Sequence, residues 1–146
     1  MEADEQLQTV LEADVEAGDF NSGGEVSSKL KDLLRKLGIP AEIVRKVAIV
    51  AYELEMNIII HSVGGHIQAQ VKPELIKVIA EDEGPGIENV EQAFQPGYST
   101  ASESIRELGF GAGMGLCNVD NYSDDLTVTS EVDKGTKIES YIKFEA

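Results

Sequence analysis

The segment AYELEMNIIIH, residues 51–61, places Glu53, Glu55 and Asn57 among apolar side chains. Because successive residues of an α-helix are about 100° apart, Glu53 and Asn57 project from one stripe, and Glu55 points roughly the opposite way. An amide oxygen can bind Mg²⁺ while a carboxylate beside it accepts a proton. Polar residues four positions apart also mark the solvent-exposed face of an ordinary amphipathic helix. This stretch alone therefore leaves open whether the residues form a site or an exposed face.

A carboxylate meets a glycine-rich turn at the end of the segment LIKVIAED. Asp82 closes that largely apolar run, and Gly84 and Gly86 follow it. Because glycine has no side chain, the backbone of such a turn can approach a ligand closely. We therefore expect Asp82 to bind a ligand, with an ordinary turn residue as the alternative.

Four glycines alternate in GFGAGMGL, at positions 109, 111, 113 and 115, just before a helical pattern. Backbone N–H groups at the start of a helix can bind phosphate. The pattern GxxxxGK[ST] is absent, and Met114 and Leu116 occupy the positions where the third glycine of a GxGxxG fingerprint would fall. The run therefore predicts a phosphate site that is neither a P-loop nor a Rossmann fingerprint.

Hydrophobic periodicity predicts the elements that must position these groups. The expected elements are a strand around residues 11–17, helices over 26–37 and from Pro40 to His61 or Ser62, a hairpin of 66–72 and 75–82, a helix over 114–125, and a hairpin of 125–132 and 136–144. This order predicts an α/β (α+β) two-layer sandwich, in which an antiparallel or mixed sheet is covered on one face by helices.

The connection between the two hairpins, residues 83–115, contains nine glycines and prolines. Connections of this length within a compact domain are usually functional lids or disordered segments. We interpret residues 96–112, approximately, as a lid. We expect residues 1–146 to form one domain, with residues 1–6 as a frayed tail.

The charge balance argues against several classes of partner. The chain has 27 acidic and 12 basic residues and a formal charge of −15. Such a charge repels nucleic acid and anionic membrane surfaces, so we expect neither as a partner. The single cysteine, Cys117, excludes an intramolecular disulfide and is interpreted as a core residue, and with no signal or membrane segment a cytoplasmic protein is expected.

Four motifs resemble, in chain order, the N, G1, G2 and terminal boxes of the GHKL ATPases, whose nucleotide-binding domain has the Bergerat fold. They are Glu53 and Asn57 as ExxxN, residues 82–86 as DxGxG, the glycine run at 109–115, and Gly135 with Thr136. The resemblance covers about residues 45–140. The small size, with no phosphoacceptor domain attached, is similar to the anti-sigma-factor and switch serine kinases, the branch that includes RsbT, RsbW and SpoIIAB.

The resemblance implies a role for each matching residue. Asp82 would accept a hydrogen bond from the adenine amino group, supported by Thr136. Asn57 would hold Mg²⁺, and Glu53 would act as general base on a serine hydroxyl or a water. The glycine run would bind the β- and γ-phosphates, and Arg106 would lie near the γ-phosphate unless it is only a solvated charge. The other implied nucleotide contacts are Gly84, Gly86, Ile87, Thr100, Gly109, Gly111, Gly113, Met114, Gly115 and Leu116.

The function that the resemblance implies is a serine/threonine protein kinase of a bacterial partner-switching pathway. It would use ATP and Mg²⁺ to phosphorylate an anti-sigma-factor antagonist of the STAS type. The alternative is an anti-sigma factor or nucleotide-gated binding module with little or no catalysis, whose partner is a sigma factor. The resemblance also allows a homodimer. Glu55 is interpreted as a surface or structural charge, and His61 as a structural residue.

Overall fold

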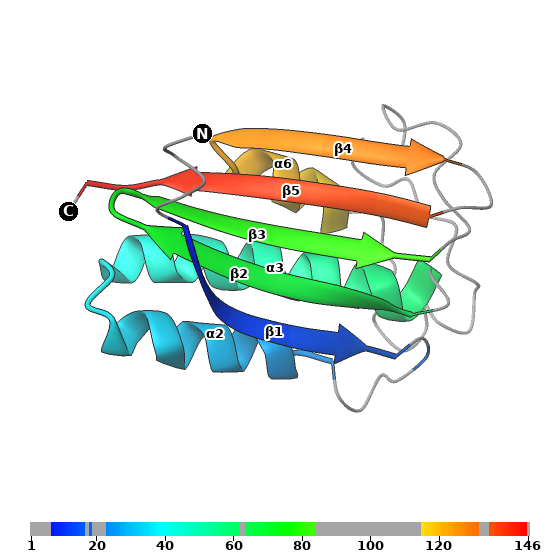
Figure 1. Cartoon of the computed structure of the whole chain (residues 1–146), viewed down its shortest axis with the longest axis horizontal. Coiled ribbons are helices and arrows are strands. Elements are labelled where there is room, and N and C mark those ends of the chain that lie inside the picture. The colour runs from blue at the N-terminus through cyan, green and yellow to red at the C-terminus, as the bar shows by residue number, and fades with distance from the viewer. Residues whose placement is uncertain are drawn as a thin grey trace.

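The computed structural model describes residues 7–16, 18, 23–61, 64–83, 115–131 and 135–145. The elements in this part of the chain are β1 (Gln8–Val15), α2 (Glu25–Lys36), α3 (Ala41–His61), β2 (Gly65–Lys72), β3 (Leu75–Asp82), α6 (Gly115–Tyr122), β4 (Asp125–Glu131) and β5 (Gly135–Lys143). The strands form one sheet in the order β1-β2-β3-β5-β4, and every neighbouring pair is antiparallel (Figure 1).

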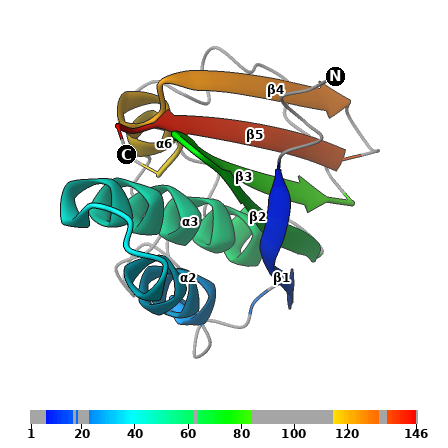
Figure 2. The same cartoon turned by 60° about the vertical axis from the view of Figure 1, so that its left-hand side comes forward.

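The helices α2, α3 and α6 lie on one face of this sheet (Figure 2). The core fills the space between the two layers. Its fully buried side chains include Leu30 and Leu34 of α2, Val47, Val50 and Leu54 of α3, and Ile67, Ile76, Val78, Ile138 and Ile142 of the sheet. The predicted two-layer sandwich with helices on one face is therefore confirmed, and the described sheet is antiparallel throughout.

Helix α2 buries one face and is followed by a glycine two residues after its end. Val26, Leu30 and Leu34, each four positions apart, are all buried, as a helix packed along one stripe requires. After the helix, Gly38 adopts φ 78°, and the N–H groups of Gly38 and Ile39 donate to the carbonyls of Arg35 and Leu34. These bonds satisfy carbonyls that the helix end would leave unpaired.

Helix α3 packs against α2 on one side, α6 on another, and the sheet beneath. It is apolar around much of its circumference, and Val47, Val50, Ala51, Leu54 and Ile58 are all buried. A helix in this position has little surface left for solvent, so each polar residue in its second half needs a specific explanation. No helix in the described ranges has the length and hydropathy required to cross a membrane.

Two element boundaries differ from the predictions by three residues, more than any other boundary. Strand β1 begins at Gln8 rather than near residue 11, and its pairing with β2 is irregular between Thr9 and Leu11. This bulge interrupts the two-residue alternation that the sequence pattern relies on. Helix α6 ends at Tyr122, although the pattern predicted a helix to residue 125, because Ser123 turns the chain: its Oγ lies 2.6 Å from the Val119 carbonyl oxygen and 2.5 Å from Oγ of Ser140.

Candidate functional site

Asp82 is the last residue of β3, and β5 holds its carboxylate. Asp82 pairs with Thr136 in the β3–β5 register, and the Thr136 N–H donates to Oδ1 of Asp82 over 3.2 Å. Thr136 is itself buried, and its Oγ1 lies 2.9 Å from Oγ of Ser130 on β4. The sheet therefore brings together two residues that the sequence assigned to one site, and it fixes the carboxylate at the strand end.

Glycines on both neighbouring strands allow the close approach around Asp82. Gly65 of β2 is its register partner on one side, and a Cβ at that position would overlap the Glu81 carbonyl oxygen. On the other side Gly135 has φ 126°, and a Cβ there would overlap the Asp82 carbonyl oxygen. Both positions require glycine, the second for its backbone conformation as well.

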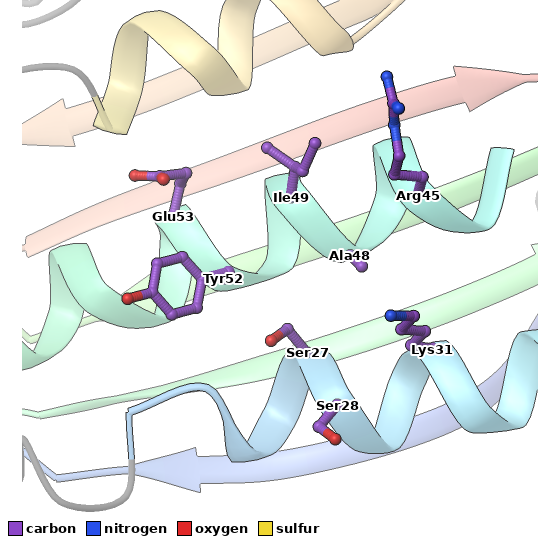
Figure 3. A pocket seen from close by; sticks show the side chains of 8 residues that line it. All are labelled: Ser27, Ser28, Lys31, Arg45, Ala48, Ile49, Tyr52 and Glu53. Carbon is purple, nitrogen blue, oxygen red and sulfur yellow. The ribbon is translucent and has the colours of Figure 1, made fainter. Parts of the chain in front are cut away.

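Glu53 and Asn57 are both half-buried on α3, as expected for two residues on one stripe beside other elements. In Figure 3 the Glu53 side chain rises on the side of α6, whereas Tyr52 points toward α2. Burial raises the pKa of Glu53, and a side-chain hydrogen bond with Asn118 of α6 opposes that shift. A half-buried carboxylate whose pKa is raised by burial and which is held by a side-chain donor is a candidate general base.

Asn118 was not among the predicted site residues. It lies one turn into α6, directly after the glycine-rich connection, and is half-buried. The only sequence signal was its place on a short helix whose neighbours, Cys117 and Val119, are apolar core residues. Its contact with Glu53 joins segments 65 residues apart, a distance that no local pattern encodes.

Glu55 is a structural residue, buried to 2% exposure. Its Oε2 accepts a hydrogen bond of 3.4 Å from the Val26 N–H at the start of α2. Gly24, the residue before the first residue of α2, has no side chain that could cap this helix. Glu55 therefore supplies from α3 the acceptor that α2 lacks. Burial raises the pKa of Glu55, and the α2 backbone donors oppose the shift.

The two parts of the candidate site share one end of the molecule. Figure 1 shows the C-terminal ends of α3 and β3 and the start of β5 at the same end of the sandwich. Glu53 and Asn57 come from the second half of α3, and Asp82 and Thr136 from the strand ends. The carboxylate of Glu53, the amide of Asn57 and the carboxylate of Asp82 therefore all come from elements that meet at this end of the sandwich.

The other predicted site residues fall mostly outside the described residues. Those outside are Gly84, Gly86, Ile87, Thr100, Arg106, Gly109, Gly111, Gly113 and Met114, together with the proposed lid. Of the rest, Gly115 is the first residue of α6, as predicted for a glycine before a helix, and Leu116 is half-buried against the core. Cys117 is buried, which confirms its interpretation as a core residue. His61 is the last residue of α3.

The fold is an α/β sandwich, and the candidate site lies on α3 and at the ends of β3 and β5. Residues 42–146 match the family described as histidine kinase-, DNA gyrase B- and HSP90-like ATPases, and the chain belongs to this family. The match includes every residue of the site described above, and it confirms the resemblance to GHKL ATPases.

Several curated relatives are anti-sigma F factors. The one from Clostridium perfringens strain 13 is 42% identical over 72 residues, which cover 49% of this chain and 48% of the relative. The one from Geobacillus sp. strain WCH70 is 33% identical over 104 residues, 67% of this chain and 66% of the relative. The chain thus spans about half the length of the Clostridium relatives that it matches.

One solved structure shares the fold over almost the whole chain. A chain from the crystal structure of the SiaB–SiaC complex of Pseudomonas aeruginosa aligns with 97% of this chain and 93% of its own length. The TM-score is 0.62 and the sequence identity 14%. At that identity the likeness establishes the fold alone.

Proposed function

We propose that this protein is an Mg-ATP-dependent serine/threonine protein kinase of a bacterial partner-switching pathway, acting on an anti-sigma-factor antagonist of the STAS type. The observation that carries the proposal is the arrangement of Glu53 and Asn57 on one stripe of α3, at the end of the molecule where β5 braces Asp82. Membership in the ATPase family and the names of the anti-sigma F relatives support it.

Each described residue has a part in the proposed reaction. Asp82, fixed by the Thr136 N–H, accepts a hydrogen bond from the adenine amino group. Asn57 would hold Mg²⁺ through its amide oxygen, and the ion would supply charge neutralisation at the phosphates. The residues fit these groups because a braced carboxylate and a half-exposed amide present acceptors of the required type.

Glu53 carries the proton transfer. It takes the proton from the acceptor hydroxyl as the hydroxyl oxygen bonds to the γ-phosphorus of ATP. The bond from that phosphorus to the β–γ bridging oxygen breaks, and ADP leaves. Burial favours the neutral acid form that Glu53 reaches at the end of this step, and Asn118 holds the carboxylate before it.

A second candidate function is an anti-sigma factor whose nucleotide state controls the affinity for a sigma factor, with slow or absent catalysis. The printed name of the curated relatives, anti-sigma F factor, favours it. In that case Asp82 and Asn57 keep their roles in nucleotide binding, and Glu53 is a charged residue of α3 that takes no part in catalysis. Both functions can occur in one protein.

The test is capture of partners from the source cell with ATP or ADP, followed by phosphosite mapping and transfer from γ-labelled ATP. We expect a phosphorylated serine or threonine on a captured partner, and loss of that label with Glu53→Gln. A complex that forms with one nucleotide and contains no phosphate would favour the binding module. Calorimetric titration of ATP onto the purified protein tests the part common to both proposals.

A further inference from the structure

A groove of about 370 Å³ runs between α2 and α3 and reaches Glu53 (Figure 3). Ala48, Ile49 and the Tyr52 ring form its apolar part on α3. Tyr52 is 37% exposed and is one of the two exposed large hydrophobic side chains among the described residues. The groove therefore combines an apolar surface with the candidate general base at one end.

Two cations line the same groove. They are Lys31 on α2 and Arg45 on α3, and both side chains are exposed. Neither makes an ion pair in the described part of the chain, whereas other lysines, such as Lys77 and Lys143, do. The chain has a formal charge of −15 and repels anions at long range. Two unpaired cations on neighbouring helices can nevertheless attract an anionic group at this groove.

The spacing of the lining residues along α3 determines how long a peptide segment bound in the groove would be. Arg45, Ile49 and Glu53 follow one another at four-residue intervals, and Figure 3 shows all three on the same side of the helix. Eight residues of helix span about 12 Å at 1.5 Å per residue. An extended peptide rises about 3.3 Å per residue, so the same span corresponds to between three and four residues.

We propose that this groove binds an extended segment of the protein substrate, with the acceptor hydroxyl at Glu53 and an acidic residue about three or four positions away at Lys31 and Arg45. This inference rests on the proposed kinase function and adds the chemistry of its substrate. Ile49 lies between Arg45 and Glu53 on the same side of α3, and it packs against the side chain between those two points. The Arg45 guanidinium, on the same side of α3 as Glu53, and the Lys31 ammonium on α2 favour a carboxylate over a neutral side chain.

The test uses a fluorescein-labelled synthetic peptide that contains one serine and two glutamates, three and four positions from it. A second peptide has glutamines in place of the glutamates. Anisotropy titrations with the full chain, loaded with a non-hydrolysable ATP analogue and Mg²⁺, measure both affinities. We expect the acidic peptide to bind about tenfold more tightly at low ionic strength and the difference to shrink as salt is added.

Two double variants with equal net charge locate the effect. Lys31→Glu with Arg45→Glu should abolish the preference for the acidic peptide. Lys29→Glu with Lys46→Glu changes exposed lysines of the same two helices that do not line the groove, and it should preserve most of the preference. Equal losses in both variants, or no discrimination by the unmodified protein, would overturn the proposal.

Nucleotide affinity and phosphate transfer, measured on the same samples, separate this proposal from the function on which it rests. Selective binding of the acidic peptide, lost only in the groove variant, supports the groove even where no phosphate is transferred. Normal ATP binding and transfer without selectivity overturn the groove and leave the kinase proposal standing.

Discussion

The Thr136 N–H donates a 3.2 Å hydrogen bond to Oδ1 of Asp82, across 54 residues of sequence and between adjacent strands. The bond orients the carboxylate from the backbone of β5, which is itself fixed in the core by Ile138 and Ile142. A ligand that bonds to Asp82 therefore meets an acceptor whose position is already set, and less conformational entropy is lost on binding.

Asp82→Asn should weaken adenine-nucleotide binding by at least about tenfold while the fold is retained. The amide keeps an oxygen that can accept from Thr136, but it loses the charge-assisted bond to the ligand, which is worth roughly 1.5–3 kcal/mol. Calorimetric titration of ATP measures the loss. Asp14→Asn is the matched control, because Asp14 is an exposed strand aspartate on β1. Unchanged ATP affinity in the Asp82 variant would contradict the adenine role.

Gly135→Ala should destabilise the protein and weaken nucleotide binding together. The new Cβ overlaps the Asp82 carbonyl oxygen, and φ 126° is strained for any residue with a side chain. We expect a loss of about 2–4 kcal/mol in the free energy of unfolding, typical of overpacking combined with backbone strain. Urea denaturation measures it. Gly38→Ala is the control: its φ is also positive, but nothing lies within 4 Å of its Cβ, so only about 1 kcal/mol should be lost.

The sequence predicted the elements well because most of them bury one face at a regular period. Leu30 and Leu34 indicated α2, and the alternation of Leu11, Ala13 and Val15 indicated β1. The β1 start was missed because a bulge breaks the alternation between Thr9 and Leu11.

The site was less accessible to sequence reasoning. Glu53, Asn57 and Asp82 were found through motif spacing. Asn118 and Gly65 were not, because each matters only through a contact with a distant segment. Glu55 shows the same limit. The sequence pattern identified a polar residue in an apolar helix, but the α2 backbone N–H that explains it lies 29 residues earlier in the chain.

Glu55→Ala should destabilise the fold by about 2 kcal/mol, since it removes the acceptor for the start of α2 and leaves buried N–H groups unpaired. Glu55→Gln should cost much less because the amide retains an acceptor and removes a buried charge. Urea denaturation of both variants at neutral pH makes the comparison. Equal losses would mean that the carboxylate charge, rather than the capping hydrogen bond, stabilises α2.

Asn118→Ala should shift the acidic limb of the pH–rate profile to higher pH. The base must be ionised, and the Asn118 hydrogen bond lowers the pKa of Glu53 against the larger effect of burial. Removing the bond raises that pKa further, so more alkaline solution is needed for the same activity. Phosphate transfer or ATP hydrolysis across a pH series measures the limb. Asn121→Ala, which removes an exposed α6 amide bonded to Cys117, should leave the limb in place.

Glu53→Gln should retain nearly the affinity of the unmodified protein for Mg-ATP, lose about 10²–10⁴ in turnover, and gain stability at neutral pH. The amide keeps the shape of the side chain but cannot accept the proton. The stability gain follows from the raised pKa: the folded protein binds a proton at Glu53 more readily than the unfolded chain does. The contribution to folding is therefore present below the ordinary pKa of 4.5 and is lost as pH rises through the folded value. Single-turnover transfer, ATP titration and urea denaturation at pH 5 and 7 measure the three effects. Undiminished turnover would remove the catalytic role from Glu53 and leave nucleotide-gated binding as the better account of the site.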